Sequence, residues 1–193
     1  MYILAGILKG RKLRSPLRGH ARPITASVKK SLFGMLGENL SGLRVADLFC
    51  GTGTLGLEAL SRGAEWCGFA DRDGSAIRRL RANITDCEVE RQTSVWRGDV
   101  TARLPDWLTQ ASQPIDLAFV DPPFADAQSW DWRRIADSLF SPLAEHLSPK
   151  GLVVLRLPKK LTPPENLGGL RLDRMRTYGS MGVALYTRAA GEE

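Results

Sequence analysis

The chain has few residues of the kinds that build metal sites and disulfide frameworks. Its 193 residues include three cysteines, none of them in a CxxC pair, and two histidines, His20 and His146, that lie far apart. An odd number of scattered cysteines argues against a disulfide-stabilised secreted domain and against a structural zinc site. We therefore expect no metal, and a reducing, cytoplasmic location.

A long hydrophobic run is also missing. The apolar stretch Met1–Leu8 is too short to span a membrane, and it has neither the charged region nor the cleavage site of a signal peptide. Hydrophobic residues make up 43% of the chain, which is ordinary for a globular protein. The sequence predicts a globular protein with no membrane partner.

Acidic residues are nearly absent from the first 45 positions. This segment has nine Lys or Arg residues and one acid, Glu38, whereas the remaining chain has 18 basic and 20 acidic residues. Charge polarised in this way favours docking on a polyanion, usually nucleic acid, and a solvated basic segment without a partner is the alternative. The candidate nucleic-acid contacts are Lys9, Arg11, Lys12, Arg14 and Arg22.

Local patterns predict a small N-terminal extension over residues 1–40, ahead of a larger domain over residues 41–193. Ile3–Gly6 and Arg11–Arg14 are expected to pair as a hairpin, and Arg18–Pro23 to form a loop. Thr25 can cap a helix that runs to about Leu36, because apolar residues recur there at helical spacing.

From residue 44 onward, short apolar segments alternate with helical patterns. Strands are predicted at 45–49, 66–70, 93–97, 115–120 and 152–157, and helices at 54–61, 73–85, 102–108 and 132–147. Two last strands, 170–178 and 182–187, are separated by three residues and should form an antiparallel hairpin. The alternation predicts an α/β, Rossmann-like fold with a mostly parallel seven-stranded sheet and helices on both faces.

A glycine-rich turn follows the first strand of the larger domain. Gly51, Gly53 and Gly56 match the dinucleotide-binding spacing, with Thr52 between the first two, although this pattern is weak evidence by itself. Glycine permits a tight turn and lets a ligand approach the backbone. Asp71, 20 residues after Gly51, stands where a carboxylate can accept both ribose hydroxyls.

Four acids, Asp47, Asp71, Asp99 and Asp121, stand at or just after the ends of predicted strands, so we expect them to line one crevice. Asp47 would repel a pyrophosphate but can help to hold an ammonium group, and Asp99 can accept the adenine amino group. The set therefore favours S-adenosylmethionine over a nicotinamide dinucleotide. The alternative for Asp47 and Asp99 is simple capping of helices or turns.

The tetrapeptide Asp121-Pro122-Pro123-Phe124 is the candidate catalytic centre. Its two prolines fix the backbone and remove two donors, which leaves outward carbonyls. The Asp121 carboxylate and the Pro122 carbonyl can accept both N–H groups of an amino group on a planar ring, and Phe124 can stack on that ring. Catalysis would then consist mainly of orientation and charge placement. The alternative is an ordinary Pro-Pro turn beside a core Phe.

Together these motifs resemble the RsmD-like family of bacterial small-subunit ribosomal RNA guanine-N2 methyltransferases, within the class I methyltransferases. The similar segments cover nearly the whole chain: Ile3–Gly6, Lys9–Leu13, Arg22–Thr25, Ser31–Phe33, Asp47–Gly53, Leu55–Ala64, Gly98–Asp99, Asp121–Phe124, Tyr178–Gly179 and Leu185–Tyr186. The resemblance implies S-adenosylmethionine as cofactor, one guanine of 16S ribosomal RNA as target, and an N-terminal extension that helps to grip RNA.

The chain departs from the family pattern at two places. Phe124 stands where Tyr is more usual, so stacking is kept and a hydroxyl contact is lost. Ile24, Ala26 and Ser27 interrupt the usual residues after Arg-Pro, which affects the contacts expected of that loop.

Other functions remain open from the sequence. The same tetrapeptide suits adenine N6 in DNA or RNA, or a protein glutamine, because each target is a planar nitrogen. A non-catalytic RNA-binding assembly factor is a further alternative, and a nicotinamide oxidoreductase is a distant one. We expect 16S ribosomal RNA or an assembling small ribosomal subunit as the partner, and a monomer.

Overall fold

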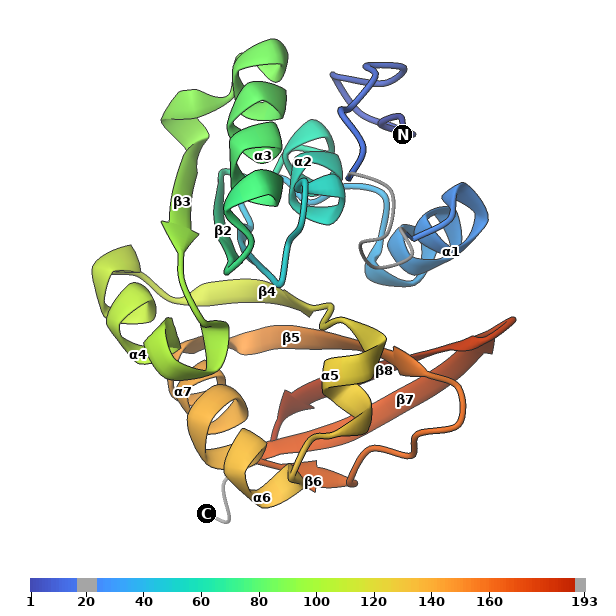
Figure 1. Ribbon diagram of the computed structural model, residues 1–193, viewed down its shortest axis with the longest axis vertical. Coiled ribbons are helices and arrows are strands. Elements are labelled where there is room, and N and C mark those ends of the chain that lie inside the picture. The colour runs from blue at the N-terminus through green and yellow to red at the C-terminus, as the bar shows by residue number, and fades with distance from the viewer. Residues whose placement is uncertain (17–23, 190–193) are drawn as a thin grey trace. The chain divides into compact units, whose positions relative to one another are not determined.

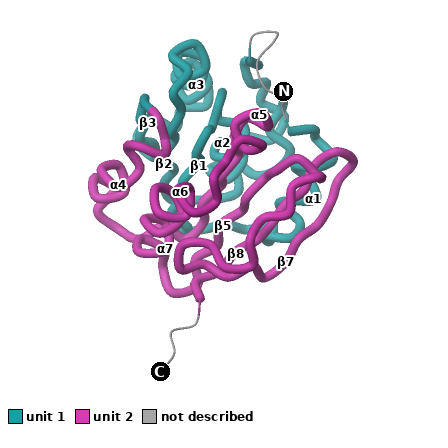
Figure 2. The backbone as a smooth tube through the Cα atoms, turned by 60° about the horizontal axis from the view of Figure 1, so that its bottom comes forward, with its two compact units in different colours: residues 1–98 teal, residues 99–193 magenta. Residues whose placement is uncertain are grey.

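The computed structural model describes residues 1–16 and 24–189. The chain forms two compact units, Met1–Gly98 and Asp99–Glu193, which Figure 2 colours separately. The boundary predicted near residue 40 lies inside the first unit. Among the helices described, none is long and apolar enough to cross a membrane.

The first unit contains three parallel strands in the order β3-β2-β1. Their bounds are β1 (Arg44–Leu48), β2 (Trp66–Asp71) and β3 (Thr93–Arg97). Helix α2 (Thr54–Ser61) follows β1, and helix α3 (Gly74–Cys87) and the short helix η1 (Glu90–Gln92) lie between β2 and β3. Every strand and helix predicted in this stretch is confirmed within two residues at each end.

The sequence of these elements explains their form. In β1 all four residues after Arg44 are buried, as expected for a strand covered on both faces. In α3 the buried residues recur at helical spacing, and Asp73 caps the helix by accepting a hydrogen bond of 2.7 Å from the Ser75 amide.

The N-terminal segment packs within the first unit. Helix α1 (Ala26–Leu36) begins after Thr25, whose hydroxyl accepts from the Val28 amide as predicted. The predicted hairpin is present as one antiparallel bridge, Tyr2 with Lys12, supported by flanking backbone hydrogen bonds. The loop predicted at Arg18–Pro23, which includes Arg22, lies outside the described residues.

The second unit contains strands in the order β4-β5-β8-β7-β6 (Figure 1). The pair β4 (Ile115–Val120) and β5 (Leu147–Pro158) is parallel, whereas β8 (Met181–Arg188) runs antiparallel to β5 and to β7 (Leu170–Tyr178). The predicted C-terminal antiparallel hairpin is thus confirmed. The helical segments are α4 (Val100–Ala111), α5 (Phe124–Gln128), α6 (Trp132–Ile135), η2 (Ala136–Phe140) and α7 (Ser141–His146).

Two features of this unit go beyond the sequence prediction. A short strand, β6 (Asn166–Leu167), adds to the seven predicted, and it pairs with β7 through Gly168 and Gly169, both with positive φ. The helical stretches predicted near 132–147 are observed, with the π-helical turn η2 between α6 and α7. The backbone of Gly168 lies against that turn so closely that a Cβ there would be 2.5 Å from the Ser141 amide.

Candidate functional site

The predicted site residues are divided between the two units. The glycine turn, Asp47 and Asp71 belong to the first unit, and Asp99 and the tetrapeptide to the second. The expectation that all four acids line one crevice stays a prediction.

The turn between β1 and α2 has an unusual backbone. Gly51 and Gly53 have φ values of 55° and 81°, and Phe49, a residue that sequence reasoning did not single out, has φ 59°. A non-glycine residue in this left-handed region is uncommon and often marks a functional turn. Asp71 holds the turn at the end of β2, because its Oδ2 accepts from the Gly51 amide at 2.7 Å and its Oδ1 from the Asp73 amide at 2.8 Å.

The three glycines of the turn have different roles. A Cβ on Gly51 would meet no heavy atom within 4 Å, so this glycine borders open space. A Cβ on Gly53 would lie 2.4 Å from the Leu80 side chain, and one on Gly56 would lie 2.4 Å from Phe69 and 2.6 Å from Cys67. Gly53 and Gly56 therefore allow helices and strands to pack closely, whereas the space beside Gly51 is open and its role in cofactor binding stays a prediction.

We expect Gly51→Ala and Gly56→Ala to separate these two roles. Gly51→Ala should weaken S-adenosylmethionine binding about tenfold or more. Its cost in stability should be only about 1–2 kcal/mol, because alanine would have to adopt the left-handed backbone conformation. Gly56→Ala should cost about 1–3 kcal/mol by overpacking against Phe69. Calorimetric titration and denaturant unfolding of both variants measure this; equal effects of the two on both quantities would contradict the assignment.

Two polar residues at the turn, Asp47 and Thr52, are buried. Asp47 is 1% exposed, and its Oδ2 accepts from the Gly56 amide at 2.8 Å, which fixes the first turn of α2. Thr52 is 2% exposed, and its hydroxyl has no hydrogen-bond partner among the described residues. A buried hydroxyl without a partner is costly. An unsatisfied hydroxyl, an open face at Gly51 and a carboxylate on the turn together fit the polar end and ribose of an adenosyl cofactor.

Asp99 caps helix α4, which was the alternative stated for it. Its Oδ1 accepts from the Thr101 amide at 2.9 Å, the Thr101 hydroxyl at 2.7 Å and the Ala102 amide at 3.4 Å. The side chain is exposed. A contact with adenine stays a prediction.

The tetrapeptide Asp121–Phe124, the candidate catalytic centre, directly follows β4, and a buried arginine contacts two of its members. Arg156, on β5, donates from Nε to Asp121 Oδ1 in an ion pair whose side chains are 8% and 17% exposed. Its guanidinium carbon also lies 5.4 Å from the centre of the Phe124 ring, and its Nη1 is 3.2 Å from Met181 Sδ. Arg156 thus holds Asp121 and Phe124 in a fixed relation.

Sequence reasoning missed Arg156, although a signal was present. It is the single charged residue in the run Leu152–Leu157, which otherwise has the composition of a fully buried strand. Because a buried arginine almost always has a partner, this run predicts an acid nearby.

The carbonyl groups of the two prolines differ in their hydrogen bonding. Pro123 O accepts from the Ala127 amide at 3.0 Å and is committed to α5, which begins at Phe124. Pro122 O accepts no hydrogen bond from the part of the chain that the structure describes. The Pro122 carbonyl therefore fits the predicted role as an acceptor for a substrate amino group.

The two cysteines near the turn, Cys50 and Cys67, are buried. Burial raises the pKa of the Cys50 thiol well above its usual value, and the carboxylates of Asp47 and Asp71 raise it further. Burial likewise raises the pKa of Cys67. Both thiols stay protonated at neutral pH, which disfavours covalent thiolate chemistry here. Within residues 1–16 and 24–189, no group of three His, Cys, Asp or Glu residues is arranged to hold a metal ion.

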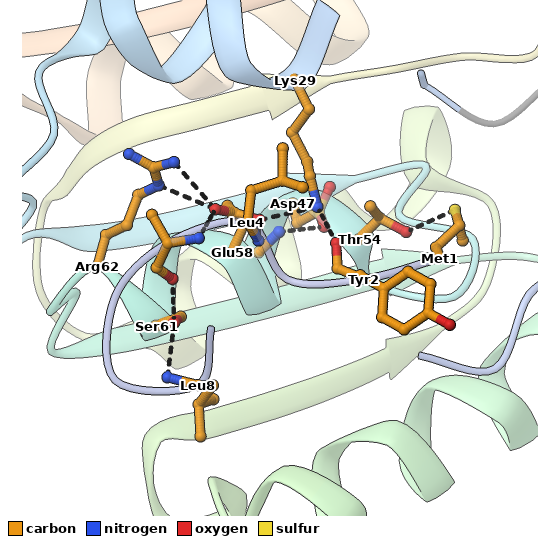
Figure 3. A network of polar contacts seen from close by, with 12 residues as sticks. Met1, Tyr2, Leu4, Leu8, Lys29, Asp47, Thr54, Glu58, Ser61 and Arg62 are labelled. Carbon is orange, nitrogen blue, oxygen red and sulfur yellow. Dashed lines mark hydrogen bonds and ion pairs between the residues drawn. The ribbon is translucent and has the colours of Figure 1, made fainter. Parts of the chain in front are cut away.

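Glu58, at the centre of α2, fastens the N-terminal segment to the first unit (Figure 3). This side chain is fully buried and accepts from the Leu4 amide at 2.8 Å and the Ala5 amide at 3.0 Å. It also forms ion pairs with Lys29 at 2.8 Å and Arg62 at 3.0 Å. The network accounts for the one charged residue, Glu58, in the buried helix α2.

The basic residues predicted to contact nucleic acid are presented on this fastened segment. Lys9, Arg11, Lys12 and Arg14 are all exposed. Arg14 forms an exposed ion pair of 3.1 Å with Asp86 on α3. Their RNA contacts stay a prediction, and Arg22 lies outside the described residues.

Comparison with known proteins agrees with these features. The family model described as conserved hypothetical protein 95 matches residues 1–187. The YlbH protein of Bacillus subtilis (strain 168) is 34% identical, over 97% of this chain and 99% of its own length. Ribosomal RNA small subunit methyltransferase D of Haemophilus influenzae is 31% identical, over 95% of this chain and 92% of its own length. The chain belongs to the RsmD-like family. The resemblance expected from the sequence is thereby confirmed.

A solved structure shows that the fold is shared as well. Hypothetical protein TTHA0928 of Thermus thermophilus is 27% identical, covers 98% of this chain and 99% of its own, and has a TM-score of 0.79. This RsmD-like chain therefore has the predicted class I methyltransferase fold, a mixed α/β sheet with an antiparallel C-terminal hairpin.

Proposed function

We propose that this protein transfers a methyl group from S-adenosylmethionine to the exocyclic N2 amino group of a guanine in 16S ribosomal RNA. The observation that carries the proposal is the Asp121–Phe124 tetrapeptide in a member of the RsmD-like family. The name of the Haemophilus influenzae relative, ribosomal RNA small subunit methyltransferase D, supports rRNA methylation. The choice of guanine N2 rests on the family resemblance.

The residues around the glycine turn would bind S-adenosylmethionine and orient it. S-adenosylmethionine supplies a methyl group on a positively charged sulfonium, which is already an activated leaving group. Asp71 presents a carboxylate on the turn, where each oxygen has a second lone pair to accept from a ribose hydroxyl. Gly51 leaves space beside it, and Asp47 keeps the first turn of α2 in position.

In the substrate half, Asp121 and Pro122 orient the amino group. Its lone pair is delocalised into the ring, so the nitrogen is a poor nucleophile until it becomes more tetrahedral. Hydrogen bonds from its two N–H groups to the Asp121 carboxylate and the Pro122 carbonyl favour that geometry, and Phe124 sets the ring plane. A strong base is unnecessary, because the methylated ammonium loses its proton readily afterwards.

The target guanine must leave its stack in the RNA before its amino group can reach Asp121. The exposed basic residues of the N-terminal segment, Lys9, Arg11, Lys12 and Arg14, would hold the RNA through its phosphates and would not select bases. Residues 1–40 would then act as the RNA-docking part of a monomeric enzyme.

The test supplies methyl-labelled cofactor with small ribosomal subunits, naked 16S ribosomal RNA, duplex DNA and bulk protein. We expect label in 16S ribosomal RNA, in at least one of the two RNA forms, and mass mapping should locate it on guanine N2. Ribosomal RNA from cells without the protein should lack that modification. Label on adenine, DNA or glutamine would replace the proposal with one of the other amino acceptors.

A further inference from the structure

We propose a second RNA-docking surface, formed by three arginines on one face of strand β7. This surface, called the β7 arginine face, consists of Arg171, Arg174 and Arg176, all exposed. It lies in the second unit, on the same sheet as the residue that holds Asp121. The inference rests on the proposed function, because RNA is its partner.

A β-bulge places the three arginines on the same face. Side chains alternate along a strand, so without a bulge positions 171, 173 and 175 would share a face. The register between β7 and β8 shifts between Leu172 and Arg174. Asp173 is the extra residue, and the alternation restarts after it.

The pairing with β8 confirms this placement. Arg171 lies opposite Thr187, Arg174 opposite Leu185, and Arg176 opposite Val183. These three β8 partners are every second residue of the strand, so their side chains point to the same face of the sheet. Residues that pair directly across two strands also share a face. Independently, a Cβ on Gly182 would lie 2.9 Å from Met175, which puts Met175 on the other face.

The β7 arginine face continues from the catalytic tetrapeptide. Arg156 lies opposite Val183 on β5, and Val183 lies opposite Arg176 on β7. Arg156, Val183 and Arg176 therefore form a row across one face of the sheet, with about 10 Å between the outer backbones. Asp121 follows β4, which is one strand further on, so its backbone is about 14–15 Å from that of Arg176. An RNA whose base reaches Asp121 would place a phosphate of a nearby nucleotide at Arg176.

Charge favours a polyanion over other partners. The residues 159–180 include five Lys or Arg and two acids, whereas the whole second unit has eleven Lys or Arg and twelve acids. The positive charge is thus concentrated on the hairpin and balanced by acids elsewhere. Asp173 pairs with Arg174 only at 4.0 Å, with both side chains about half exposed, so this weak pair leaves the arginine available to a phosphate.

The shape of this face suits the backbone of a nucleic acid better than a segment of a partner protein. Val183 and Leu185, the β8 residues opposite Arg176 and Arg174, are buried, so the face offers charge at its exposed edge and no open apolar groove. Planar guanidinium groups suit bidentate phosphate contacts. The hairpin would therefore position RNA without selecting its sequence.

The test compares R171Q/R174Q/R176Q with the wild-type chain. Binding to naked 16S ribosomal RNA should weaken about tenfold or more at about 0.15 M salt. The slope of log K against log salt should fall by about two to three, because each lost phosphate contact removes roughly 0.7–0.9. Binding of S-adenosylmethionine and the thermal midpoint should not change, since all three side chains are exposed.

The matched control is R133Q/R134Q/K150Q, which removes the same charge from exposed positions in the same unit. It should change RNA affinity less than twofold to threefold, as screened surface charges do. Equal salt slopes for the two triple variants would overturn the proposal. So would a loss of binding to ribosomal subunits without a loss on naked RNA, because the partner would then be protein.

The two proposals fail in distinguishable ways. If the wild-type chain methylates 16S ribosomal RNA and the β7 variant behaves as the control does, only the β7 arginine face is wrong. If the wild-type chain binds no RNA, both fail. If it binds RNA through these arginines but transfers no methyl group, the surface stands and the enzyme assignment fails.

Discussion

Asp121→Ala should abolish most methyl transfer while leaving S-adenosylmethionine binding unchanged. Loss of one oriented contact to the reacting group costs about a hundred- to a thousand-fold in rate. Here the loss should fall on kcat, because Asp121 is proposed to orient the amino group and is not among the residues proposed to bind the cofactor. Single-turnover methylation and calorimetric titration of the cofactor measure both quantities.

The ion pair with Arg156 complicates the simple variant and also provides its control. Removing Asp121 leaves a buried guanidinium without its carboxylate, which costs about 3–5 kcal/mol. The double variant Asp121→Ala with Arg156→Met removes both charges and should recover much of that stability. Activity should not recover. A double variant that regains methyl transfer would show that Asp121 acts only by balancing Arg156.

Arg156→Lys and Arg156→Gln separate positioning from charge alone. Arg156 does not itself bond to substrate in our proposal, so it is a positioning residue. Lysine keeps the charge and should retain more activity than glutamine, with the loss again in kcat and not in KM for RNA. A purely structural role would lower the stability of both variants without that split.

Glu58→Gln should destabilise the protein strongly. It leaves Lys29 and Arg62 without their carboxylate and turns one acceptor into a donor that faces backbone N–H groups. Because both charged partners are nearly fully buried, the expected loss is about 3–5 kcal/mol in the free energy of unfolding. Glu65→Gln, on an exposed side chain of the same unit, is the matched control and should cost less than about 0.5 kcal/mol.

The pH dependence of this loss has a definite sign. Burial lowers the pKa of Lys29 below its usual 10.5, and the hydrogen bond and charge of Glu58 oppose that shift. Without the carboxylate the pKa falls further. Between that lower pKa and 10.5 the unfolded chain binds more protons than the folded one, so stability rises with pH. The deficit of Glu58→Gln relative to the wild-type chain should therefore shrink from about pH 7 to about pH 10, and a deficit that grows would contradict this account.

Elements with strong local signals could be predicted from the sequence. The strand β1 is a short segment with Val45, Ala46 and Leu48 as its apolar residues, and α1 and α3 have capping residues followed by apolar residues at helical spacing. The C-terminal hairpin has only three residues between its predicted strands. In contrast, the π-helical turn within 132–146 packs closely against Gly168, a contact between distant positions that no local pattern encodes.

The candidate site, too, has features that the sequence predicts and features that only the tertiary structure shows. The sequence by itself determined the family, the class of fold, and the order of glycine turn, acids and tetrapeptide, because these are matters of residue type and spacing. Only the tertiary structure decided that Asp47 is buried under α2, that Arg156 pairs with Asp121, and that Glu58 fastens the N-terminal segment. Such pairings join residues 9 to 54 positions apart, and packing of whole elements, not local propensity, selects them.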